Sequence, residues 1–421
     1  RVVIPPGDYI FHSLFFKSHT NLEIQKGARL QAIESTRERA ILPGLTRDYQ
    51  GGEYYLGSWE GIPLDCYAGL FTLLDVEDVN IYGEGVIEAN ASKSGFWSKP
   101  KEKDGAWRPR TIFMRRVKDV AVVGIKIKNS PSWTIHPMES RKLMFINTSI
   151  ENPWDSPNTD GINPESCRDV EIVGCHFSLG DDCIAIKSGK IYMAQQLGIP
   201  SEKIRIRNCF MEHGHGGVTL GSEIAGGVRD VKVSQCIFQD TDRGLRIKTR
   251  RGRGELSVVD KISFDNIQMN RVMAPFVLNM FYFCDPDGHS DYVQNKEDIG
   301  ASPIDLPTLR SFSFKNIDVK DATLAGIFAY GLPERLIEEI VMENVHIDMV
   351  APDKREGNQP AMMDGEEWDP SQVLFLKNVQ SLTCRNVSIG AYETDGEHLE
   401  NIGEEDTAGL IWEIKETAQE E

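Results

Sequence analysis

One short pattern recurs along most of this chain of 421 residues: alternating apolar residues, then Asn or Gly, then further apolar residues. Alternation over about five residues is typical of a strand with one buried face. Asn and Gly suit the tight bend that follows, because both tolerate left-handed backbone angles. Copies include Val79-Asn80-Ile81-Tyr82-Gly83, Val120-Ala121-Val122-Val123-Gly124, Val170-Glu171-Ile172-Val173-Gly174, Ile204-Arg205-Ile206-Arg207-Asn208, Ile262-Ser263-Phe264-Asp265-Asn266 and Ile340-Val341-Met342-Glu343-Asn344.

These copies predict a right-handed parallel β-helix, an all-β fold in which each coil stacks about 4.8 Å from the next. No long amphipathic helical pattern separates the strands, which excludes a barrel of alternating strands and helices. Two larger gaps, Asn266 to Asn316 and Asn344 to Asn386, predict loops that leave a coil. The alternative is a multi-domain β-sandwich, whose antiparallel hairpins would not repeat one Asn or Gly position. We therefore expect a single β-helix catalytic domain over residues 1–421.

Composition narrows the partners and leaves the compartment open. The net charge of −18 argues against a nucleic-acid binder, and no apolar run is long enough to predict a membrane span. The chain begins in strand-like sequence at Arg1, so we expect a truncated N-terminus. Cys175, Cys209 and Cys236 share one repeat position, which favours a buried column over a disulfide framework. These features favour a cytoplasmic protein slightly over a secreted or periplasmic one, and they leave the oligomeric state unknown.

Three aspartates fall in the same part of the repeat, and two of them occupy equivalent positions. Asp181 and Asp182 are adjacent, and a shift of 22 residues places Asp160-Gly161-Ile162 on Asp182-Cys183-Ile184. A shift of that length corresponds to about one coil, so the three carboxylates should be stacked neighbours. Ionised carboxylates are costly to bury without partners, which predicts that they face solvent or a cleft. The plainer interpretation of an Asp-Asp pair is a solvated turn.

Further alignment brings other chemical groups beside the aspartates. Matching Gly174 with Asn208 places Asp181 on His215, and the next copy places His215 on Asp242. Arg246 falls in a predicted outward column with Asn163, Ala185 and Thr219, whereas Lys248 falls in the next column with Lys187 and Gly221. His215 could belong to a structural turn, and the two cations to a solvated strand face. Their convergence on the carboxylates favours a ligand site.

Three clustered carboxylates are suited to acid/base hydrolysis of a glycosidic bond. Mutual repulsion should raise the pKa of at least one, leaving a protonated acid beside ionised bases. Direct attack by water requires an acid and a base about 6.5–9.5 Å apart and inverts the anomeric centre. Arg246 can grip a carboxylate through two parallel hydrogen bonds, and Lys248, Lys187 and the run Arg250 to Arg253 extend the positive charge. The combination indicates a uronic-acid polymer.

Four motifs resemble the polygalacturonases, the family 28 glycoside hydrolases. They are Asn158-Thr159-Asp160, Gly180-Asp181-Asp182, Gly214-His215-Gly216 and Arg246-Ile247-Lys248, in the family's order, and flanking segments such as Ser130 to His136 are also similar. The resemblance implies a pectin lyase-like β-helix and inverting hydrolysis of α-1,4-linked galacturonic acid. It requires no metal or other cofactor.

The resemblance also assigns roles residue by residue. Asp181 takes the role of general acid, and Asp160 and Asp182 take the role of bases that activate water. His215 is a supporting active-site residue, and Arg246 and Lys248 bind the substrate carboxylate. Tyr282 is the nearest match to a cleft tyrosine of the family. Asn158 and Lys187 are further candidate binding residues, and His136, which aligns with Asn163, is expected either to line a sugar subsite or to pack in the core.

Similarity is greatest to the bacterial exo-acting branch. Ile4-Pro5-Pro6-Gly7-Asp8-Tyr9, the loop from Phe283 to Gly288 and Gly331-Leu332-Pro333-Glu334 carry this resemblance. Long insertions, from Tyr49 to Cys66 and from Asp285 to Leu306, could close one end of the cleft and enforce removal of terminal units, or they could be inert.

Three alternatives remain open. A rhamnogalacturonan or xylogalacturonan hydrolase would share the fold and much of the site. A pectate lyase would use calcium and β-elimination on a similar scaffold. A non-catalytic carbohydrate-binding β-helix would not need three aspartates around a histidine.

Overall fold

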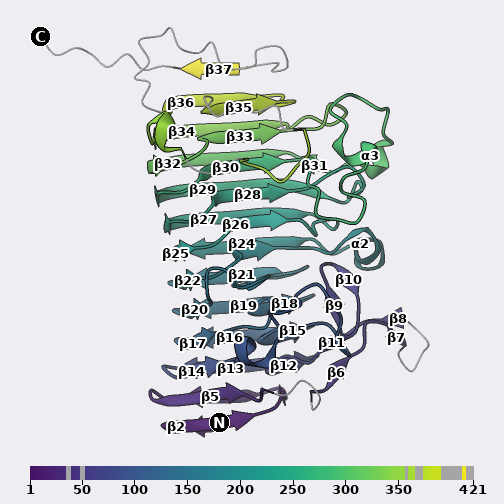
Figure 1. The fold of residues 1–421 in the computed structure, drawn as a ribbon, viewed down its shortest axis with the longest axis vertical. Helices are drawn as coiled ribbons and strands as arrows, with labels where there is room; N and C mark the ends of the chain where they lie inside the picture. Colours follow the sequence, from purple (N-terminus) through teal and green to yellow (C-terminus); the bar gives the residue numbers. More distant parts are fainter. Residues whose placement is uncertain (35–38, 48–52, 356–358, 366–372, 390–409, 414–421) are drawn as a thin grey trace, which may run out of the picture.

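The chain winds into a stack of coils whose strands run parallel from one end of the molecule to the other (Figure 1). The computed structural model describes residues 1–34, 39–47, 53–355, 359–365, 373–389 and 410–413. A representative coil comprises β21 (Arg168–Val173), β22 (His176–Ser178) and β23 (Asp182–Ile186), each of which pairs in parallel with the corresponding strand of the next coil. The predicted parallel β-helix is confirmed, and the β-sandwich alternative is wrong.

The strands group into two long faces and several short sheets. The largest sheet contains β1 (Val2–Ile4), β2 (Gly7–Phe11), β4 (Thr20–Ile24), β5 (Ala28–Ala32), β13 (Glu77–Gly83), β14 (Val86–Glu88), β16 (Lys118–Val123), β17 (Lys126–Lys128), β19 (Arg141–Ile146), β20 (Ser149–Glu151), β21, β22, β24 (Ser201–Arg207), β25 (Phe210–His213), β27 (Val228–Gln239), β29 (Val258–Asn270), β31 (Thr308–Leu309), β32 (Ser311–Ala322), β34 (Glu339–Met349), β36 (Leu382–Ile389) and β37 (Leu410–Glu413). The second face contains β3 (Leu14–Phe15), β12 (Phe71–Leu74), β15 (Ile112–Arg115) and β18 (Ile135–Met138), and then β23, β26 (Gly216–Gly221), β28 (Arg243–Lys248), β30 (Ala274–Asn279), β33 (Ile327–Tyr330) and β35 (Leu374–Lys377). Short antiparallel pairs join β6 (Ile41–Leu42) with β11 (Cys66–Tyr67), β7 (Thr46–Arg47) with β8 (Glu53–Tyr54), and β9 (Ser58–Trp59) with β10 (Ile62–Pro63).

The core is built from inward columns that repeat from coil to coil. Ile184 pairs with Val218, Val218 with Leu245, and Leu245 with Phe276, and all four side chains are buried. Alternate residues of each strand point into this core because successive side chains of a strand face opposite sides. The parity predicted from the sequence is therefore confirmed.

The bend positions adopt the backbone geometry that their sequence predicts. Asn208, Asn266 and Asn344 have φ of 55°, 58° and 54°, and Gly174 has φ of 64°. Left-handed angles of this kind are accessible to Asn and Gly at low cost. The Asn side chains also connect coils, since Asn344 donates to Asn316 at 3.0 Å and Asn386 donates to Asn344 at 2.9 Å.

The predicted long loops leave the stack where the repeat spacing widens. The first separates β30 from β32 and carries α3 (Asp291–Gln294) and a 3-10 turn, η1 (Pro303–Asp305); the second follows β34 and begins with η2 (Pro352–Lys354). Two further short helices are α1 (Ala91–Ser94) and α2 (Ile191–Leu197). In Figure 1, α2, α3, β9 and β10 all project from the same edge of the stack.

The cysteine column predicted from the sequence is also present. His176 pairs with Phe210 and Phe210 with Ile237, which brings the preceding cysteines, Cys175, Cys209 and Cys236, into line. All three are buried, and each of the eight cysteines is a free thiol.

Two predictions reach beyond what the structure describes. The single domain predicted over residues 1–421 includes segments that lie outside the described ranges. The first residues of the insertion from Tyr49 to Cys66 also lie outside them. Within the described ranges, every helix is too short or too polar to cross a bilayer.

Candidate active site

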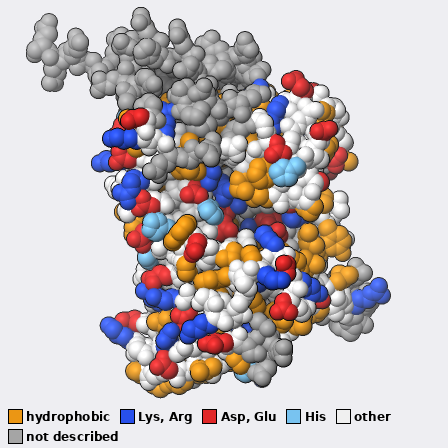
Figure 2. All heavy atoms as spheres, viewed as in Figure 1, with side chains coloured by type: hydrophobic (Ala, Val, Ile, Leu, Met, Phe, Trp, Pro, Cys, Tyr) orange, Lys and Arg blue, Asp and Glu red, His pale blue; other side chains and the backbone are white. Residues whose placement is uncertain are grey.

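A pocket of about 380 Å³ lies on the outer surface of β23, β26 and β28. Figure 2 shows a hollow about half-way along this face, where acidic and basic side chains gather. The pocket is lined by Glu60, Lys101, Trp133, Asn158, Asp160, Asp181, Asp182, Lys187, Lys190, His215, Ser222, Glu223, Asp242, Arg243, Arg246, Lys248, Tyr282, Cys284, Asp285 and Met362. The list contains nine of the ten predicted site residues, and the exception is His136.

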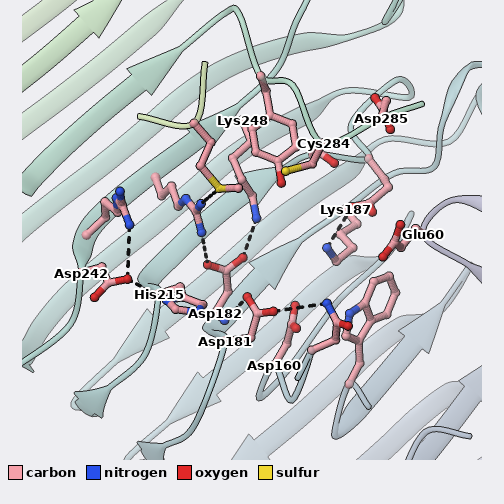
Figure 3. Close-up of a pocket in the computed structure, with 18 of the residues that line it drawn as sticks. Glu60, Asp160, Asp181, Asp182, Lys187, His215, Asp242, Lys248, Cys284 and Asp285 are labelled. Carbon is pink, nitrogen blue, oxygen red and sulfur yellow. Dashed lines mark hydrogen bonds and ion pairs between the residues drawn. The ribbon is translucent and has the colours of Figure 1, made fainter. Parts of the chain in front are cut away.

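The three predicted carboxylates converge in this pocket (Figure 3). Ile162 pairs with Ile184, which is the 22-residue register expected from the sequence. One carboxylate oxygen from each of Asp160, Asp181 and Asp182 lies within 4.8 Å of the other two. The carboxylates are therefore closer together than the 6.5–9.5 Å expected for an acid and a base on opposite sides of a sugar.

Asp182 is buried and held by two cations from β28. Its Oδ2 accepts from Lys248 Nζ at 2.7 Å, and its Oδ1 accepts from Arg246 at 3.2 Å. Burial alone would raise the pKa of Asp182, but Lys248 and Arg246 together hold this pKa well below its ordinary value. Asp182 is therefore the carboxylate of the cluster that stays ionised.

Asp160 is the opposite case, since no cation among the described residues forms an ion pair with it. It is 3% exposed, and its Oδ2 accepts a hydrogen bond from Asn163 at 2.8 Å. Burial, followed by the negative charge of Asp181, raises the pKa of Asp160 to about 8. Because the three groups interact, the cluster as a whole holds a proton near neutral pH.

Asp181 is the member of the cluster with the most access to the pocket, being only partly buried where Asp160 and Asp182 are buried. Its Oδ2 accepts from Asn158 Nδ2 at 3.5 Å, and its Oδ1 accepts from the backbone of Asp182 at 2.9 Å. Asn158 has a left-handed φ of 54° and is itself held by Arg108, which donates to its Oδ1 at 2.6 Å. Arg108 thus holds Asn158 in place beside Asp181, and this role was not predicted from the sequence.

His215 lies beside the carboxylates and is paired with Asp242. The two are joined by a hydrogen bond of 2.6 Å between Nδ1 and Oδ2. This hydrogen bond, with the nearby charge of Asp181, raises the pKa of His215 above its ordinary value. The alignment that placed His215 on Asp242 predicted their proximity, although not the bond between them.

The opposite end of the pocket is closed by groups from distant segments. Lys187 Nζ donates to Glu223 at 2.9 Å, and Lys190 Nζ lies 2.9 Å from Asp285 of the long loop after β30. Glu60, at the tip of the β9–β10 hairpin, is paired with Lys101. We call these three ion pairs the end wall. The repeat revealed only Lys187 of these six residues, because all six lie outside the strands and the other five belong to segments that do not repeat.

Three sequence predictions need correction. His136 is completely buried, donates to or accepts from Glu165 at 2.7 Å, and packs edge-on against Trp133. Its packing role is therefore the correct interpretation, and its sugar subsite is wrong. The column containing Asn163 and Arg246 does point away from the core, but it is buried rather than exposed, since other segments cover it; Met362, for example, contacts Arg246.

The arginine run after β28 does not extend the positive charge of the pocket. Arg250 and Arg253 pair with Asp285, at 2.9 and 2.7 Å. Arg251 is fully buried and pairs with Glu334 at 2.9 Å. These arginines instead anchor the long loop that carries part of the end wall.

The carboxylate cluster is the one group of potential metal ligands found in the described residues. Carboxylate oxygens suit Ca²⁺ and Mg²⁺, but Lys248 and Arg246 already neutralise Asp182, and Asp160 tends to carry a proton. The absence of a metal requirement stays a prediction.

Comparison with known proteins places the chain in a family. Residues 63–330, more than half of the chain, match the family described as "Glycosyl hydrolases family 28". The chain therefore belongs to family 28 of the glycosyl hydrolases, as its motifs predicted.

A "Probable polygalacturonase" of Vitis vinifera is 28% identical over 84% of this chain and 68% of its own length. An "Endo-polygalacturonase" of Pectobacterium carotovorum is 27% identical over 79% of this chain and 76% of its own. The chain spans about half the length of several other curated relatives that it matches.

Solved structures share the architecture. An exopolygalacturonase of Thermotoga maritima superposes with a TM-score of 0.68, at 28% identity, over 82% of this chain and 79% of its own. A family 28 exopolygalacturonase of Yersinia enterocolitica superposes with a TM-score of 0.72 over 97% of this chain and 72% of its own, and its 19% identity bears on the fold alone. The right-handed parallel β-helix of the polygalacturonases is the fold of this chain.

Proposed function

We propose that this protein hydrolyses the α-1,4 linkages of polygalacturonate or oligogalacturonides, and that it removes terminal units. The observation that carries the proposal is the convergence of Asp160, Asp181 and Asp182 beside Arg246 and Lys248 in one pocket. Membership of family 28 and similarity to polygalacturonases support the substrate class.

The three carboxylates divide the chemistry according to their surroundings. Asp181 donates a proton to the leaving oxygen, because it is the most accessible of the three. Asp182, kept ionised by its two cations, and Asp160 position and deprotonate the attacking water. The proton that burial stabilises on Asp160 belongs to the coupled cluster, so Asp181 can be supplied with it as the substrate binds. His215 supports Asp181 from the open side of the pocket.

Arg246 and Lys248 recognise the uronate carboxylate. Each contacts Asp182 through one nitrogen, and their remaining N–H donors can serve a second carboxylate. Tyr282 lies next to them, with its ring centroid 5.7 Å from Lys248 Nζ. Lys187 faces the pocket and donates to Glu223 and to the carbonyl of Gly221, which leaves one N–H donor for the substrate. Asn158 orients Asp181.

The end wall supports the removal of terminal units. Four side chains of the end wall are largely buried, with Lys187 at 4%, Glu223 at 6%, Asp285 at 6% and Lys190 at 15% exposure, whereas Glu60 and Lys101 at its outer edge are 28% and 62% exposed. His215 at the other end of the pocket is 52% exposed. A galacturonate chain entering from the open end would stop at the wall. Relatives named as exo- and endo-acting enzymes both occur, so the wall carries this part of the proposal.

Stereochemistry is the second part to be tested. The four motifs favour inversion, whereas the close approach of the carboxylates resembles the 5–5.5 Å spacing of retaining enzymes. Proton NMR of the first product formed from an oligogalacturonide distinguishes them, since inversion of an α-linkage gives the β-anomer.

Product analysis on oligogalacturonides of defined length tests the main proposal. We expect monogalacturonate to be released from the first time points, while the viscosity of polygalacturonate falls slowly. Rapid loss of viscosity with few new reducing ends would overturn exo action. Products absorbing in the ultraviolet would indicate a lyase, and hydrolysis only of xylose- or rhamnose-bearing pectin would indicate one of the related hydrolases.

A further inference from the structure

Trp154 is the most exposed large hydrophobic side chain of the described residues, with 79% of its surface accessible. It lies in the turn that leads from β20 to the catalytic Asp160. Exposure of an indole on a loosely held loop would need no explanation. The turn that carries Trp154 is, however, held firmly at both ends.

The hydrogen bonds of this turn leave its tip little freedom. Asn152 accepts from the backbone of Ser130 at 2.7 Å, and Ser156 donates to the carbonyl of Pro153 at 2.6 Å. On the other side, Arg108 donates to the carbonyl of Pro157 at 2.8 Å. Trp154 is thus presented to solvent from a preorganised support, which lowers the entropic cost of binding a ligand.

A second hollow of about 300 Å³ adjoins this turn on the side away from the catalytic pocket. Its lining is polar and includes both signs of charge: Lys128, Asn129, Glu151, Asn152, Pro153, His176, Ser178 and Glu212. His176 is bonded to Glu212 at 2.8 Å, and Lys128 to Glu151 at 3.1 Å. We call this hollow the side groove. Its hydroxyl, amide and charged groups are the kinds of partner that sugar hydroxyls and carboxylates use.

The side groove and the catalytic pocket lie on either side of one column of turns. Three chain segments cross from the groove to the pocket: Pro153 to Asn158, Ser178 to Asp181, and Glu212 to His215. The shorter crossings take three residues, a span on the order of 10 Å at most. In Figure 1, β20, β22 and β25 lie at the edge of the stack opposite to α2, β9 and β10. The end-wall residues Lys190 and Glu60 lie directly before α2 and between β9 and β10. The side groove therefore adjoins the open end of the pocket.

We propose that Trp154 and the side groove form an additional binding region for the part of the galacturonate chain that extends beyond the scissile bond. This inference rests on the proposed function, since it concerns the same substrate. A chain whose terminal unit is stopped by the end wall would leave the pocket at its open end, past the exposed His215. The segments Ser178 to Asp181 and Glu212 to His215 lead from there to the side groove, which adjoins the turn that carries Trp154. The indole face packs against the C–H face of a sugar ring. Lys128 and His176 are already paired with Glu151 and Glu212, so Asn129 and Ser178 of the side groove meet the sugar hydroxyls. The enzyme would thus favour long chains, although it removes one unit at a time.

Hydrolysis of di-, tri-, tetra- and hexagalacturonate by Trp154→Ala tests this inference. We expect the ratio of kcat/KM for the hexamer to kcat/KM for the dimer to fall about tenfold, and Trp154→Phe to restore most of it. Phe15→Ala, which removes an exposed aromatic ring from the first coils, is the matched control and should leave the ratio unchanged.

A ratio that Trp154→Ala leaves unchanged would overturn the inference, as would an equal loss of kcat/KM at every chain length. Calorimetric titration of hexagalacturonate into the Asp181→Asn variant, with and without Trp154→Ala, gives a second measurement that does not depend on turnover. Weaker binding of the hexamer in the double variant supports the inference, and equal binding contradicts it. If the unmodified protein hydrolyses no oligogalacturonide at all, the proposed function itself fails, which is a separate result.

Discussion

Lys248 Nζ donates to Oδ2 of Asp182 at 2.7 Å, although the two residues belong to strands that lie two coils apart. The contact fixes the protonation state of one member of the carboxylate cluster, and it comes from a residue outside the turn that carries this aspartate. The other buried member, Asp160, has no comparable cation and retains its proton to a much higher pH. Contacts from neighbouring coils therefore give two aspartate side chains different protonation states.

Replacement of the proposed acid should separate catalysis from folding. Asp181→Asn keeps the size of the side chain and its contact with Asn158, but it cannot donate a proton as a carboxylic acid. We expect kcat on digalacturonate to fall by about 10²–10⁴. Circular dichroism and the thermal midpoint should change little. A variant that binds sugar and retains full turnover would show that Asp181 is not the acid.

Stability should depend on pH through Asp160. The pKa of this group is raised in the folded protein from 3.8 to about 8, so the folded state binds more protons than the unfolded state between about pH 4 and pH 8. The free energy of unfolding must then decrease as pH rises through this window. Asp160→Asn should remove that decrease and stabilise the protein at pH 8 by an amount on the order of a few kcal/mol.

The matched control for this experiment is Asp155→Asn in the same turn, where the side chain is exposed. Urea unfolding at pH 5, 6.5 and 8 measures all three proteins. An Asp160→Asn variant with the same pH dependence as the unmodified protein would contradict the assignment. Below about pH 4 the sign reverses, because protonation of Asp182, whose pKa is lowered, removes its ion pairs.

Chelators should leave hydrolysis unaffected. Two of the three carboxylates in the cluster are unsuited to a divalent cation, since Asp182 is neutralised by two cations and Asp160 tends to be protonated. The measurement is the initial rate on trigalacturonate with and without EDTA, with Ca²⁺ and Mg²⁺ added back. A loss that either ion reverses would show that the cluster binds a metal.

The end wall depends on a buried arginine. Arg251 is fully buried and donates to Glu334 and to the carbonyl of Asn295 at 2.7 Å. Arg251→Met leaves the Glu334 carboxylate without its cation, with only the backbone N–H of Ile299 among the described residues still donating to it, and this loss should cost about 3–5 kcal/mol. Thermal unfolding measures the loss. Arg271→Met, which breaks an exposed pair with Asp240, is the control and should cost about 1 kcal/mol or less.

One bend position offers a sharp test of backbone geometry. Asn344 has φ of 54° and donates to Asn316 of the preceding coil. Asn344→Ala loses this hydrogen bond. It also places alanine at a left-handed φ, where it lacks the side-chain hydrogen bonds that make asparagine tolerable, and this costs about 1–2 kcal/mol. Asn344→Gly loses the same hydrogen bond, but glycine adopts the left-handed φ without steric cost. We expect the alanine variant to unfold at a lower urea concentration than the glycine variant, and the reverse order would contradict the argument.

The sequence predicted those parts of the site that lie in the repeat. Asp160, Asp181, His215 and Arg246 could be aligned because hydrogen bonding between parallel strands fixes the register of each coil on the next. The bend angles were predictable for a related reason, since few residues tolerate them.

Groups carried by the loops could not be predicted in this way. Glu60 and Asp285 reach the pocket from segments whose path is set by tertiary contacts rather than by the repeat. His136 was placed in the correct column, but register does not reveal which columns are covered by other segments. The arginines after β28 were misinterpreted for the same reason, since their acidic partners are in the long loop.

The pocket draws its lining from positions as far apart as Glu60 and Met362, and among the described strands between them β23 and β28 are the ones that supply lining residues. No short piece of the chain contains a working subset. Turnover during refolding should therefore appear late and abruptly, after most of the circular dichroism signal has recovered. Enzyme activity would then report when the last coils have folded.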